Sequence, residues 1–222
     1  MPRVAVQAST GTPRFDPAQP PWVSPVTLEG ARIRLEPLSI DHLAELAEVA
    51  FEPSIWRWTV ARPANLDGLR AWVEAALRSA EAGTELPFAT IDIASGRPVG
   101  STRFLSIMPE HRRLEIGWTW LGTAYQRTGA NREAKYLQME HAFTSLGANR
   151  VEFKTHSENA KARAGLLGIG ATFEGIFRNH MIMPDHRIRH SAWYSVTVEE
   201  WPGVRAKLQA ALGRGTMGGD LR

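Results

Sequence analysis

The chain has 222 residues, contains no cysteine, and carries 26 basic and 23 acidic side chains, for a formal net charge of +3. The lack of cysteine excludes disulfides, thiolate zinc sites and a cysteine nucleophile. This small basic excess is not a nucleic-acid-binding signature, although it can help to attract an anionic ligand. The histidines show no metal-ligand spacing, so we expect no metal site.

Both ends of the chain have the composition of tails, around one domain over residues 27–212. Residues 1–26 are rich in proline and lack apolar periodicity, and residues 213–222 are rich in glycine. No apolar run reaches membrane-spanning length, and no signal peptide is recognisable. The expected location is therefore the cytoplasm, with no membrane contact.

The first half of the domain mixes strands and helices. Alternating polar and apolar residues indicate strands, and apolar residues three or four apart indicate helices. The expected elements are a strand over 31–36, helices over 41–49 and 67–82, and a hairpin of strands over 86–93 and 99–108. Ser39 is the expected cap of the first helix.

The second half continues the mixture. Its expected elements are a strand over 113–121, a helix over 133–146, a strand over 150–155, a short helix over 158–167, strands over 171–183 and 187–198, and a helix over 199–212. This order indicates an α/β (α+β) fold around one sheet. The lack of sustained strand–helix alternation and of a GxGxxG motif argues against a Rossmann domain.

The segment YQRTGANR, residues 125–132, joins a predicted strand to a predicted helix. The first backbone N–H groups of a helix lack intrahelical partners, and the helix dipole makes that end partly positive. A phosphate can bind there, and Gly129 lets the backbone approach it closely because glycine has no Cβ. Such junctions are common, so the alternative is a plain helix start with solvated arginines.

The ordered set QRTGAN, helix, LGANRVEFKT, Asn159, helix, GATFEGIFR resembles the GNAT superfamily of acetyl-CoA-dependent N-acyltransferases. Within it, the set is most similar to the ribosomal-protein N-terminal acetyltransferase (Rim-like) branch, over about residues 26–205. The resemblance implies a mixed, mostly antiparallel sheet flanked by helices and splayed between the strands over 113–121 and 150–155. It also implies acetyl transfer to a primary amine, either a protein N-terminus or a small amine, and a homodimer.

The resemblance assigns most acetyl-CoA contacts to the loop, whose backbone N–H groups would bind the pyrophosphate. Asn131 departs from the Gly or Ala that most of the superfamily has there, as is common in the Rim-like branch. Asn159 has an alternative role as the cap of the helix that it opens. The expected cofactor-binding residues are Trp118, Gln126, Arg127, Thr128, Gly129, Ala130, Asn131, Arg132, Asn159 and Arg163.

Glu115 is the first candidate for the general base. Counting with the period of a strand places it with Gly117 and Thr119 on one face, opposite Leu114, Ile116 and Trp118. A carboxylate in the middle of a sheet is costly unless it is paired or functional. An ammonium has no lone pair with which to attack a thioester, so a base must remove its proton. The alternative is a salt bridge to a nearby arginine at position 103, 112 or 113.

The general acid is less well defined. The branch usually has a serine three residues after the asparagine, which can protonate the leaving thiolate, but this chain has Ala162 there. Tyr194 is the hydroxyl candidate, with Tyr125 and Ser157 as alternatives. His156 stands where the branch commonly has an acid and is the second candidate for the base, although a structural role is the alternative.

The expected mechanism is direct attack on acetyl-CoA in a ternary complex, with a backbone N–H near residues 117–119 polarising the thioester carbonyl. Two W-x-W pairs, Trp56/Trp58 and Trp118/Trp120, are expected to fill core, and part of the first pair can wall an acceptor pocket. Because Ala162, His156 and His190 depart from the family pattern, a CoA-binding sensor or interaction protein without efficient turnover remains an alternative.

Overall fold

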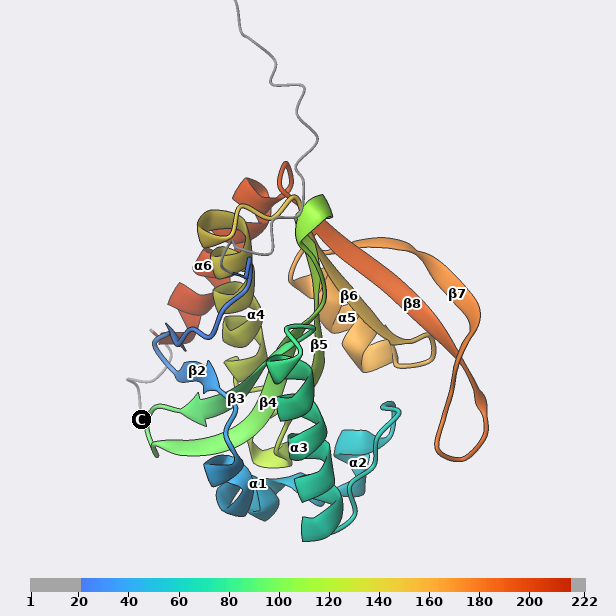
Figure 1. The fold of residues 1–222 in the computed structure, drawn as a ribbon. Coiled ribbons are helices and arrows are strands. Elements are labelled where there is room, and N and C mark those ends of the chain that lie inside the picture. The colour runs from blue at the N-terminus through green and yellow to red at the C-terminus, as the bar shows by residue number, and fades with distance from the viewer. Residues whose placement is uncertain (1–20, 217–222) are drawn as a thin grey trace, which may run out of the picture.

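Figure 1 shows the computed structural model of the protein, which describes residues 21–216. One eight-stranded sheet runs through the molecule in the order β1-β2-β3-β4-β5-β6-β8-β7. All neighbouring strands are antiparallel except β5 and β6. The predicted fold, a mixed and mostly antiparallel sheet flanked by helices, is confirmed.

The N-terminal half contains the first four strands and three helices. They are β1 (Leu28–Glu29), β2 (Ile33–Pro37), α1 (Leu43–Ala50), α2 (Pro53–Trp56), α3 (Leu66–Glu81), β3 (Leu86–Asp92) and β4 (Arg97–Met108). Ser39 accepts a hydrogen bond from the Asp41 N–H and opens a 3-10 turn over 40–42 that leads into α1. The capping prediction is therefore confirmed, one turn before the α-helix itself.

The C-terminal half contains the remaining strands and helices. They are β5 (Arg113–Leu121), α4 (Ala130–Glu140), a π-helical turn (His141–Ser145), β6 (Arg150–His156), α5 (Ala160–Gly168), β7 (Thr172–Ile182), β8 (Ile188–Thr197) and α6 (Trp201–Thr216). Helix α4 begins at Ala130, before the predicted start at Glu133, because Gly129 already takes the N-cap position. Helix α6 continues to Thr216, beyond its predicted end at Leu212.

The two faces of the sheet carry different helices. Helices α1, α2 and α3 cover one face through a cluster that includes Leu46, Leu69 and Trp72. We call this the α3 face. Helices α4, α5 and α6 lie on the opposite side of the sheet, which we call the α4 face, and its core includes Phe143 and Trp201. The site residues described below divide between these faces.

The sheet splits between β5 and β6. The two strands pair only from Arg113 to Glu115, opposite residues 150–152. Strand β5 then continues to Leu121 and β6 to His156 without pairing to each other, and the β6–β8–β7 half turns away from the rest of the sheet (Figure 1). This is the predicted splay, in the predicted place.

A β-bulge at Trp118 lies within this split. Gly117 pairs with Arg103 and Trp120 with Ser101, so two residues of β5 stand opposite one residue of β4. Trp118 itself has φ 50°, in the left-handed region. The bulge shifts the alternation, so the side chain of Trp118 turns to the α3 face and that of Thr119 to the α4 face. The face prediction for these two residues was wrong because it assumed an unbroken strand.

The start of the described chain is fixed to α4. The carboxylate of Glu133 accepts hydrogen bonds from the backbone N–H groups of Ala31, Arg32 and Ile33, at 2.7–3.0 Å. Trp22 donates from its indole N–H to the carbonyl of Leu146 at 2.8 Å. Residues 21–26 therefore lie against the domain, whereas the rest of the two predicted tails, residues 1–20 and 217–222, lies outside the described residues.

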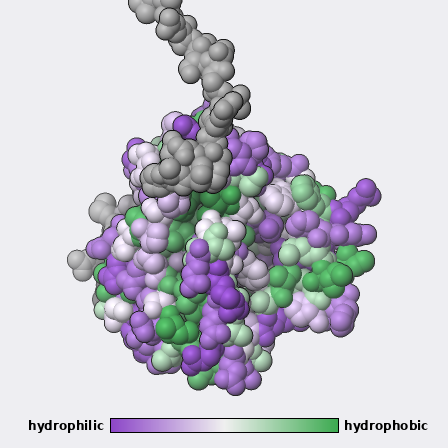
Figure 2. Space-filling model, in the orientation of Figure 1, coloured by the Kyte–Doolittle hydropathy of each residue, from purple (hydrophilic) through white to green (hydrophobic). Residues whose placement is uncertain are grey.

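The surface of the β7–β8 half is partly apolar. Figure 2 shows hydrophobic side chains gathered over these two strands, among polar surroundings. The large apolar residues exposed there are Phe173, Ile176, Phe177, Ile182 and Ile188. Exposed apolar patches of this kind mark interaction surfaces in many proteins.

Candidate functional site

The N-terminus of α4 is open toward solvent. Gly129 is its N-cap, with φ 95° and no side-chain cap hydrogen bond. A Cβ built on Gly129 would meet no atom within 4 Å, so free space lies in front of the loop. Arg127 and Arg132 are exposed on either side of it. An uncapped helix start with flanking arginines fits the binding of a phosphate group.

The rest of the loop is held by its own hydrogen bonds. Thr128 donates from its hydroxyl to the carbonyl of Tyr125 at 2.8 Å. Gln126 donates to the carbonyl of Leu121 at 3.1 Å and accepts from the ammonium of Lys161 at 2.6 Å. Gln126 therefore links the loop to both β5 and α5, which positions the backbone of the loop rather than offering a free side chain.

Asn159 is the N-cap of α5. Its side-chain oxygen accepts a hydrogen bond from the backbone N–H of Ala162 at 3.1 Å. The capping alternative is therefore correct. The cap uses only the oxygen, and the amide NH₂ group has two further donors. A contact of Asn159 with acetyl-CoA stays a prediction that is compatible with the cap.

Arg163 connects α5 to the neighbouring strands. Its guanidinium donates to the Tyr194 hydroxyl and to the Ser157 carbonyl, both at 3.0 Å, and lies 5.4 Å from the ring centre of Phe173. These contacts fix the side chain in place. Its predicted contact with acetyl-CoA is not tested by this geometry.

Glu115 is buried, with an exposed fraction of 1%, and forms an ion pair with Lys154 of β6 at 2.9 Å. The suggested arginine partners are wrong, since Arg113 pairs with Glu152 and Arg103 with Glu85. Burial raises the pKa of Glu115, and the ammonium of Lys154 opposes that shift. The side chain thus lies where β5 and β6 begin to separate, on the α3 face.

His156 lies on the same face, at the end of β6. Its Nδ1 accepts a hydrogen bond from the backbone N–H of Glu158 at 3.1 Å, and its ring lies 4.8 Å from that of Trp58. Burial lowers the pKa of His156, and the charge of Arg189 adds to the effect. Because Nδ1 is an acceptor, a neutral ring carries its proton on Nε2 and offers a donor there.

Tyr194 lies on the other face of the sheet. It pairs with Phe153 in the β6–β8 ladder, and both rings belong to the core under α4. Residues paired across antiparallel strands point to the same face, so Tyr194 and Glu115 are on opposite faces. The structure therefore places Glu115 and His156 of the predicted catalytic set on one face of the sheet, and Tyr194 on the other.

Lys135 of α4 is a buried residue that the sequence analysis missed. Its ammonium donates to the Thr119 hydroxyl at 2.6 Å and lies 5.9 Å from the ring centre of Phe153, so it spans the split between β5 and β6. Burial lowers its pKa to about 7, and the charge of Glu115 opposes the shift. Its spacing from the buried residues Met139 and Ala142 is that of one helix face, a signal that could have identified it.

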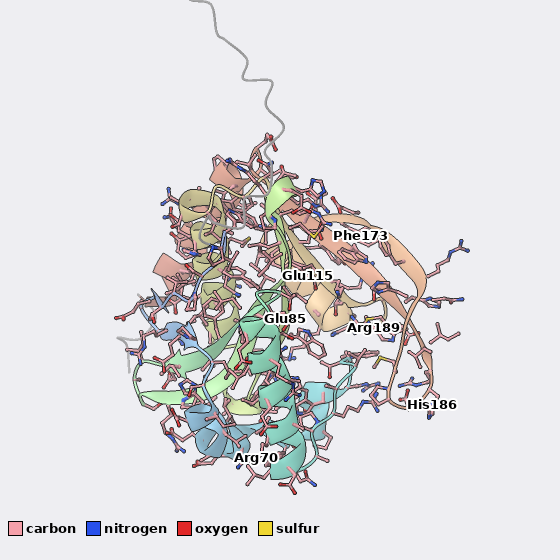
Figure 3. The ribbon with its side chains drawn as sticks, viewed as in Figure 1. Arg70, Glu85, Glu115, Phe173, His186 and Arg189 are labelled. Carbon is pink, nitrogen blue, oxygen red and sulfur yellow. The ribbon has the colours of Figure 1, made fainter. Side chains whose placement is uncertain are left out.

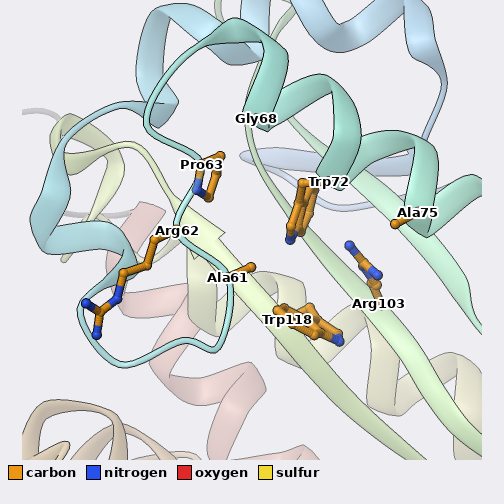
Figure 4. A pocket seen from close by; sticks show the side chains of 8 residues that line it. All are labelled: Ala61, Arg62, Pro63, Gly68, Trp72, Ala75, Arg103 and Trp118. Atoms are coloured by element: carbon orange, nitrogen blue, oxygen red, sulfur yellow. The ribbon is translucent and has the colours of Figure 1, made fainter. Parts of the chain in front are cut away.

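A cavity of about 400 Å³ opens on the α3 face, beside the bulge. Figure 4 shows Trp72 of α3, Arg103 of β4 and Trp118 of β5 projecting into it. The Arg103 guanidinium lies 4.3 Å from the ring centre of Trp72 and 5.2 Å from that of Trp118. The aromatic walls of the cavity therefore come from Trp72 and Trp118, whereas Trp56 and Trp120 are core and Trp58 contacts His156.

The segment after α2 joins the two halves of the sheet on this face. The carbonyl of Trp58 accepts from the buried Arg189 of β8 at 3.2 Å. Arg62 forms an ion pair with Asp185 of the β7–β8 turn, also at 3.2 Å. Figure 3 shows Glu115, Arg189 and His186 placed along this side of the molecule. The segment therefore bridges the split on the α3 face.

Residues 21–216 contain no group of three or more His, Asp or Glu side chains placed to hold a metal ion. None of the helices in the same range is long and apolar enough to cross a membrane.

Comparison with known proteins identifies the family. The sequence profile of the GNAT acetyltransferase domain matches residues 32–172, so the chain belongs to the GNAT acetyltransferase family. A GCN5-related N-acetyltransferase from Brucella melitensis is similar to it in structure, with a TM-score of 0.82 and 34% identity, covering 91% of this chain and 90% of that one.

Two more distant proteins bear on the branch. The N-acetyltransferase p20 of Bacillus licheniformis is 24% identical over 155 residues, which are 69% of this chain and 86% of that protein. RimJ of Mycobacterium smegmatis, in complex with CoA-disulfide, has the same fold, with a TM-score of 0.73 and 22% identity, covering 84% of this chain and 95% of that one. The fold implied by the predicted Rim-like resemblance is thus shared with RimJ.

Proposed function

We propose that the protein transfers the acetyl group of acetyl-CoA to a primary amine by direct attack in a ternary complex. The observation that carries the proposal is the split of the sheet. At one end of the split lies the uncapped N-terminus of α4, and at the other lies the buried ion pair of Glu115 and Lys154. Family membership supplies the acetyl transfer itself.

The residues fit acetyl-CoA as the acetyl donor. The α4 N-terminus would bind its pyrophosphate through backbone N–H groups, with Arg127 and Arg132 adding charge. Asn159 would donate its free amide protons to the pantetheine arm while its oxygen caps α5. The unpaired edges of β5 and β6 beyond Glu115 supply further backbone groups along the split.

Glu115 is the proposed base. A carboxylate that takes the proton of the ammonium frees the nitrogen lone pair for attack on the thioester carbon, and the sulfur leaves with the bonding electrons. Lys154 favours the ionised form of Glu115, against the effect of burial on its pKa. Because Glu115 is buried, a water molecule would relay the proton from the amine.

The bulge at Trp118 supplies a place for the developing negative charge on the carbonyl oxygen. A bulged residue loses a partner in the strand ladder, so a backbone N–H in this region is free to act as a donor. Lys135 and Thr102 hold the neighbouring Thr119 hydroxyl, at 2.6 and 2.7 Å. These bonds fix the backbone at the bulge.

The leaving thiolate can be protonated from either face. His156 offers its Nε2 proton on the α3 face. In this role it is a proton donor, whereas the sequence suggested it as the second candidate for the base. Tyr194 offers its hydroxyl proton on the α4 face, where Arg163 donates to its oxygen. A thiolate is a good leaving group, so the absence of a serine at Ala162 need not prevent turnover.

The second candidate function is binding of CoA without efficient turnover, which Ala162 favours because it removes the usual acid of the branch. One experiment distinguishes the transferase from the CoA-binding sensor. The purified protein is incubated with acetyl-CoA and a panel of amines and N-terminal peptides, and acetylated products are measured by mass spectrometry. Products that depend on acetyl-CoA and on Glu115 support the transferase. Tight CoA binding with no product from any amine supports the sensor.

The proposal includes the assembly and the location of the protein. The exposed apolar surface of the β7–β8 half is the proposed homodimer contact, since Phe177 and Ile182 are exposed there. We propose no nucleic-acid partner, because the charge is nearly balanced, and we propose a cytoplasmic location. Light scattering measures the dimer.

A further inference from the structure

Lys135 of α4 is a buried cation without an anionic partner. Its exposed fraction is 6%, and it forms no ion pair within residues 21–216. Its ammonium donates to the Thr119 hydroxyl at 2.6 Å, although an ammonium has three N–H donors. A buried charge is costly unless it is paired, and Thr119 supplies only a neutral acceptor. The fold alone therefore gives little reason for a lysine at this position.

Lys135 lies between the two ends of the proposed acetyl-CoA site. It follows Ala130, the first residue of α4, by five positions, which is about 7–8 Å along the helix axis. It is also bonded to Thr119, the residue after the bulge at Trp118. The arm of CoA that joins the pyrophosphate to the thioester has to connect the α4 N-terminus to the bulge, and its course therefore passes beside Lys135.

The split is open beside Lys135. Strands β5 and β6 pair only as far as Glu115 and Glu152, so Thr119 and Phe153 lie beyond the pairing. The ammonium of Lys135 contacts Thr119 of β5 and lies 5.9 Å from the ring centre of Phe153 of β6. Thr119 is half-buried although β5 is a central strand, so solvent reaches β5 at this level. A group that enters the split here lies next to the ammonium.

Glu115 and Lys135 approach the split from opposite faces of the sheet. Glu115 is on the α3 face, whereas Lys135 is on the α4 face, together with the helix end that would hold the pyrophosphate. Among the described residues, the charge of Glu115 is the one that acts on Lys135. Its contacts on β5 and β6, Thr119 and Phe153, do not titrate. The proposed base and a cation thus stand on either side of the place for the thioester.

The acidity of Lys135 suits proton donation to sulfur. Burial lowers the pKa of Lys135 to about 7, and the charge of Glu115 opposes the shift. An alkyl thiol such as that of cysteine has a pKa of about 8.5, so a thiolate takes a proton readily from such an ammonium. Of the other candidate donors, Tyr194 is 0% exposed and belongs to the core, and His156 is on the face of the base.

We propose that Lys135 is the general acid of the reaction and donates the proton of its ammonium to the sulfur of CoA. This rests on the proposed acetyl transfer and names the acid that Ala162 leaves open. As the C–N bond forms, the C–S bond breaks and its electron pair stays on sulfur, which receives the proton from Nζ of Lys135. Glu115 receives the proton of the amine. Exchange with water then restores the ammonium and the carboxylate.

Bromoacetyl-CoA tests the position of Lys135 without turnover. Its CH₂ carbon alkylates a nearby neutral amine with loss of bromide. The protein is incubated with this reagent above the pKa of Lys135, and the modified residue is located by mass spectrometry. We expect the label on Lys135, suppressed by excess acetyl-CoA, and none on Lys207, which is exposed on α6. Calorimetry with CoA measures binding in the same preparation.

A pH–rate profile tests the transfer of the proton. Lys135→Gln can still donate a hydrogen bond to Thr119, but it has no proton to give. Its rate should be lower than that of the wild type by about tenfold or more below the pKa of Lys135. The loss should shrink above that pKa, because the wild type then also lacks the proton. Lys207→Gln should match the wild type throughout, and melting temperatures report on the fold.

Thr119→Val separates proton donation from support of the bulge. It removes the hydroxyl that Lys135 holds and keeps the lysine, so its rate should not show the pH-dependent loss of Lys135→Gln. If the two variants have the same profile, Lys135 acts by holding Thr119 and the proposed acid is wrong. A loss in Lys135→Gln that is equal at every pH leads to the same conclusion.

The outcomes for the acid and for the transferase are distinct. If CoA binds and acetyl groups are transferred while the label avoids Lys135, the acid is overturned and the transferase stands. If CoA binds without any transfer, a label on Lys135 still supports its place at the sulfur, and a label elsewhere overturns it. A protein that does not bind CoA overturns both.

Discussion

The paired and the split parts of the β5–β6 border satisfy their polar groups differently. In the paired part, Glu152 accepts from Arg113 at 3.1 Å and from Arg150 at 2.8 Å, and Arg150 also pairs with Glu174. Beside the split part, Trp72 of α3, Arg103 of β4 and the amide of Gln138 on α4 keep buried donors that have no partner among the described residues. The first arrangement holds the fold together, whereas the second leaves buried polar groups incompletely bonded.

The difference between the paired and the split parts shows where the protein tolerates buried polar groups without hydrogen-bond partners. A buried polar group without a partner destabilises a protein by roughly 1–3 kcal/mol. Several such groups lie on the elements beside the split, together with the buried ammonium of Lys135. We infer that the site is built from polar groups that the fold alone leaves incompletely bonded. Changes at Glu115, where the pairing ends, and in the loop at the α4 N-terminus should therefore affect ligand binding or rate, and changes in the paired part before Glu115 should affect stability only.

The largest expected effect comes from Gly129→Val, which should abolish measurable acetyl-CoA binding with the fold retained. A β-branched side chain is strained at φ 95°, and it would occupy the space in front of the α4 N-terminus. The matched control is Gly96→Val in the β3–β4 turn, which has φ 70° and equally open surroundings. Calorimetry should find normal affinity in the control. Normal affinity in a folded Gly129→Val protein would remove the loop from the site.

Glu115→Gln should lower the rate of transfer by about 10²–10⁴-fold with little change in acetyl-CoA affinity. The amide keeps the size of the side chain but cannot accept the proton, and the loss should shrink as the pH rises because free amine then forms without help. Glu152→Gln, a buried glutamate on the same face, is the control. A pH–rate profile measures both. If Glu115→Gln lowers stability but its pH–rate profile runs parallel to that of the wild type at nearly the same rate, Glu115 is only the ion-pair partner of Lys154 and not the base.

Lys135→Met should change how stability depends on pH. The pKa of Lys135 is lowered to about 7, so from there to its ordinary value of 10.5 the unfolded chain holds a proton that the folded protein has lost. Stability of the wild type should therefore rise with pH in this range, by up to about 1.4 kcal/mol per unit from this residue.

Urea denaturation at several pH values tests this. The methionine variant should lose the upward slope and should be relatively more stable below pH 7, where the wild type buries a charge. Lys207→Met, on the exposed side of α6, should keep the slope. Equal slopes in all three proteins would show that Lys135 does not titrate as described.

Asn159→Ala should weaken acetyl-CoA binding by about 1–2 kcal/mol and lower stability by about 1 kcal/mol, because it removes both a donor and a cap. Asn65→Ala is the matched control, since Asn65 caps α3 through Gly68 at 2.9 Å but is not a predicted cofactor contact. The control should lose stability alone. If both variants behave alike, Asn159 is only a cap.

Arg150→Ala should have the smallest effect, a loss of stability of about 1 kcal/mol or less, because its ion pairs are partly exposed. Acetyl-CoA affinity and the rate of transfer should stay at wild-type values. A large fall in either quantity would mean that the paired part of the β5–β6 border belongs to the site, as the split part does.

The sequence was most informative where the pattern is local. The loop around Gly129, the strand before it and the helix after it are adjacent in the chain, so one glycine and its flanking arginines define them. The split of the sheet was predicted from the family resemblance rather than from periodicity. The local failure at Trp118 came from a bulge that no residue pattern in β5 announces.

The contacts that complete the site are distant in sequence. Glu115 pairs with Lys154, 39 residues later, and the backbone of Trp58 binds Arg189, 131 residues later. The sheet order brings β6 and β8 beside β5, and that order depends on the whole domain. Pairing the nearest arginines with Glu115 therefore failed, because neighbours in the chain were preferred to neighbours in space.

Hydrogen exchange with and without saturating acetyl-CoA tests the central claim most directly, because it locates the ligand without any mutation. We expect slower exchange in peptides that cover residues 127–132 and 117–121, where backbone N–H groups at the α4 N-terminus and the bulge would be engaged. Peptides from β7, residues 172–182, should be unchanged by the ligand itself. Unchanged exchange over 127–132 in a protein saturated with acetyl-CoA would contradict the account.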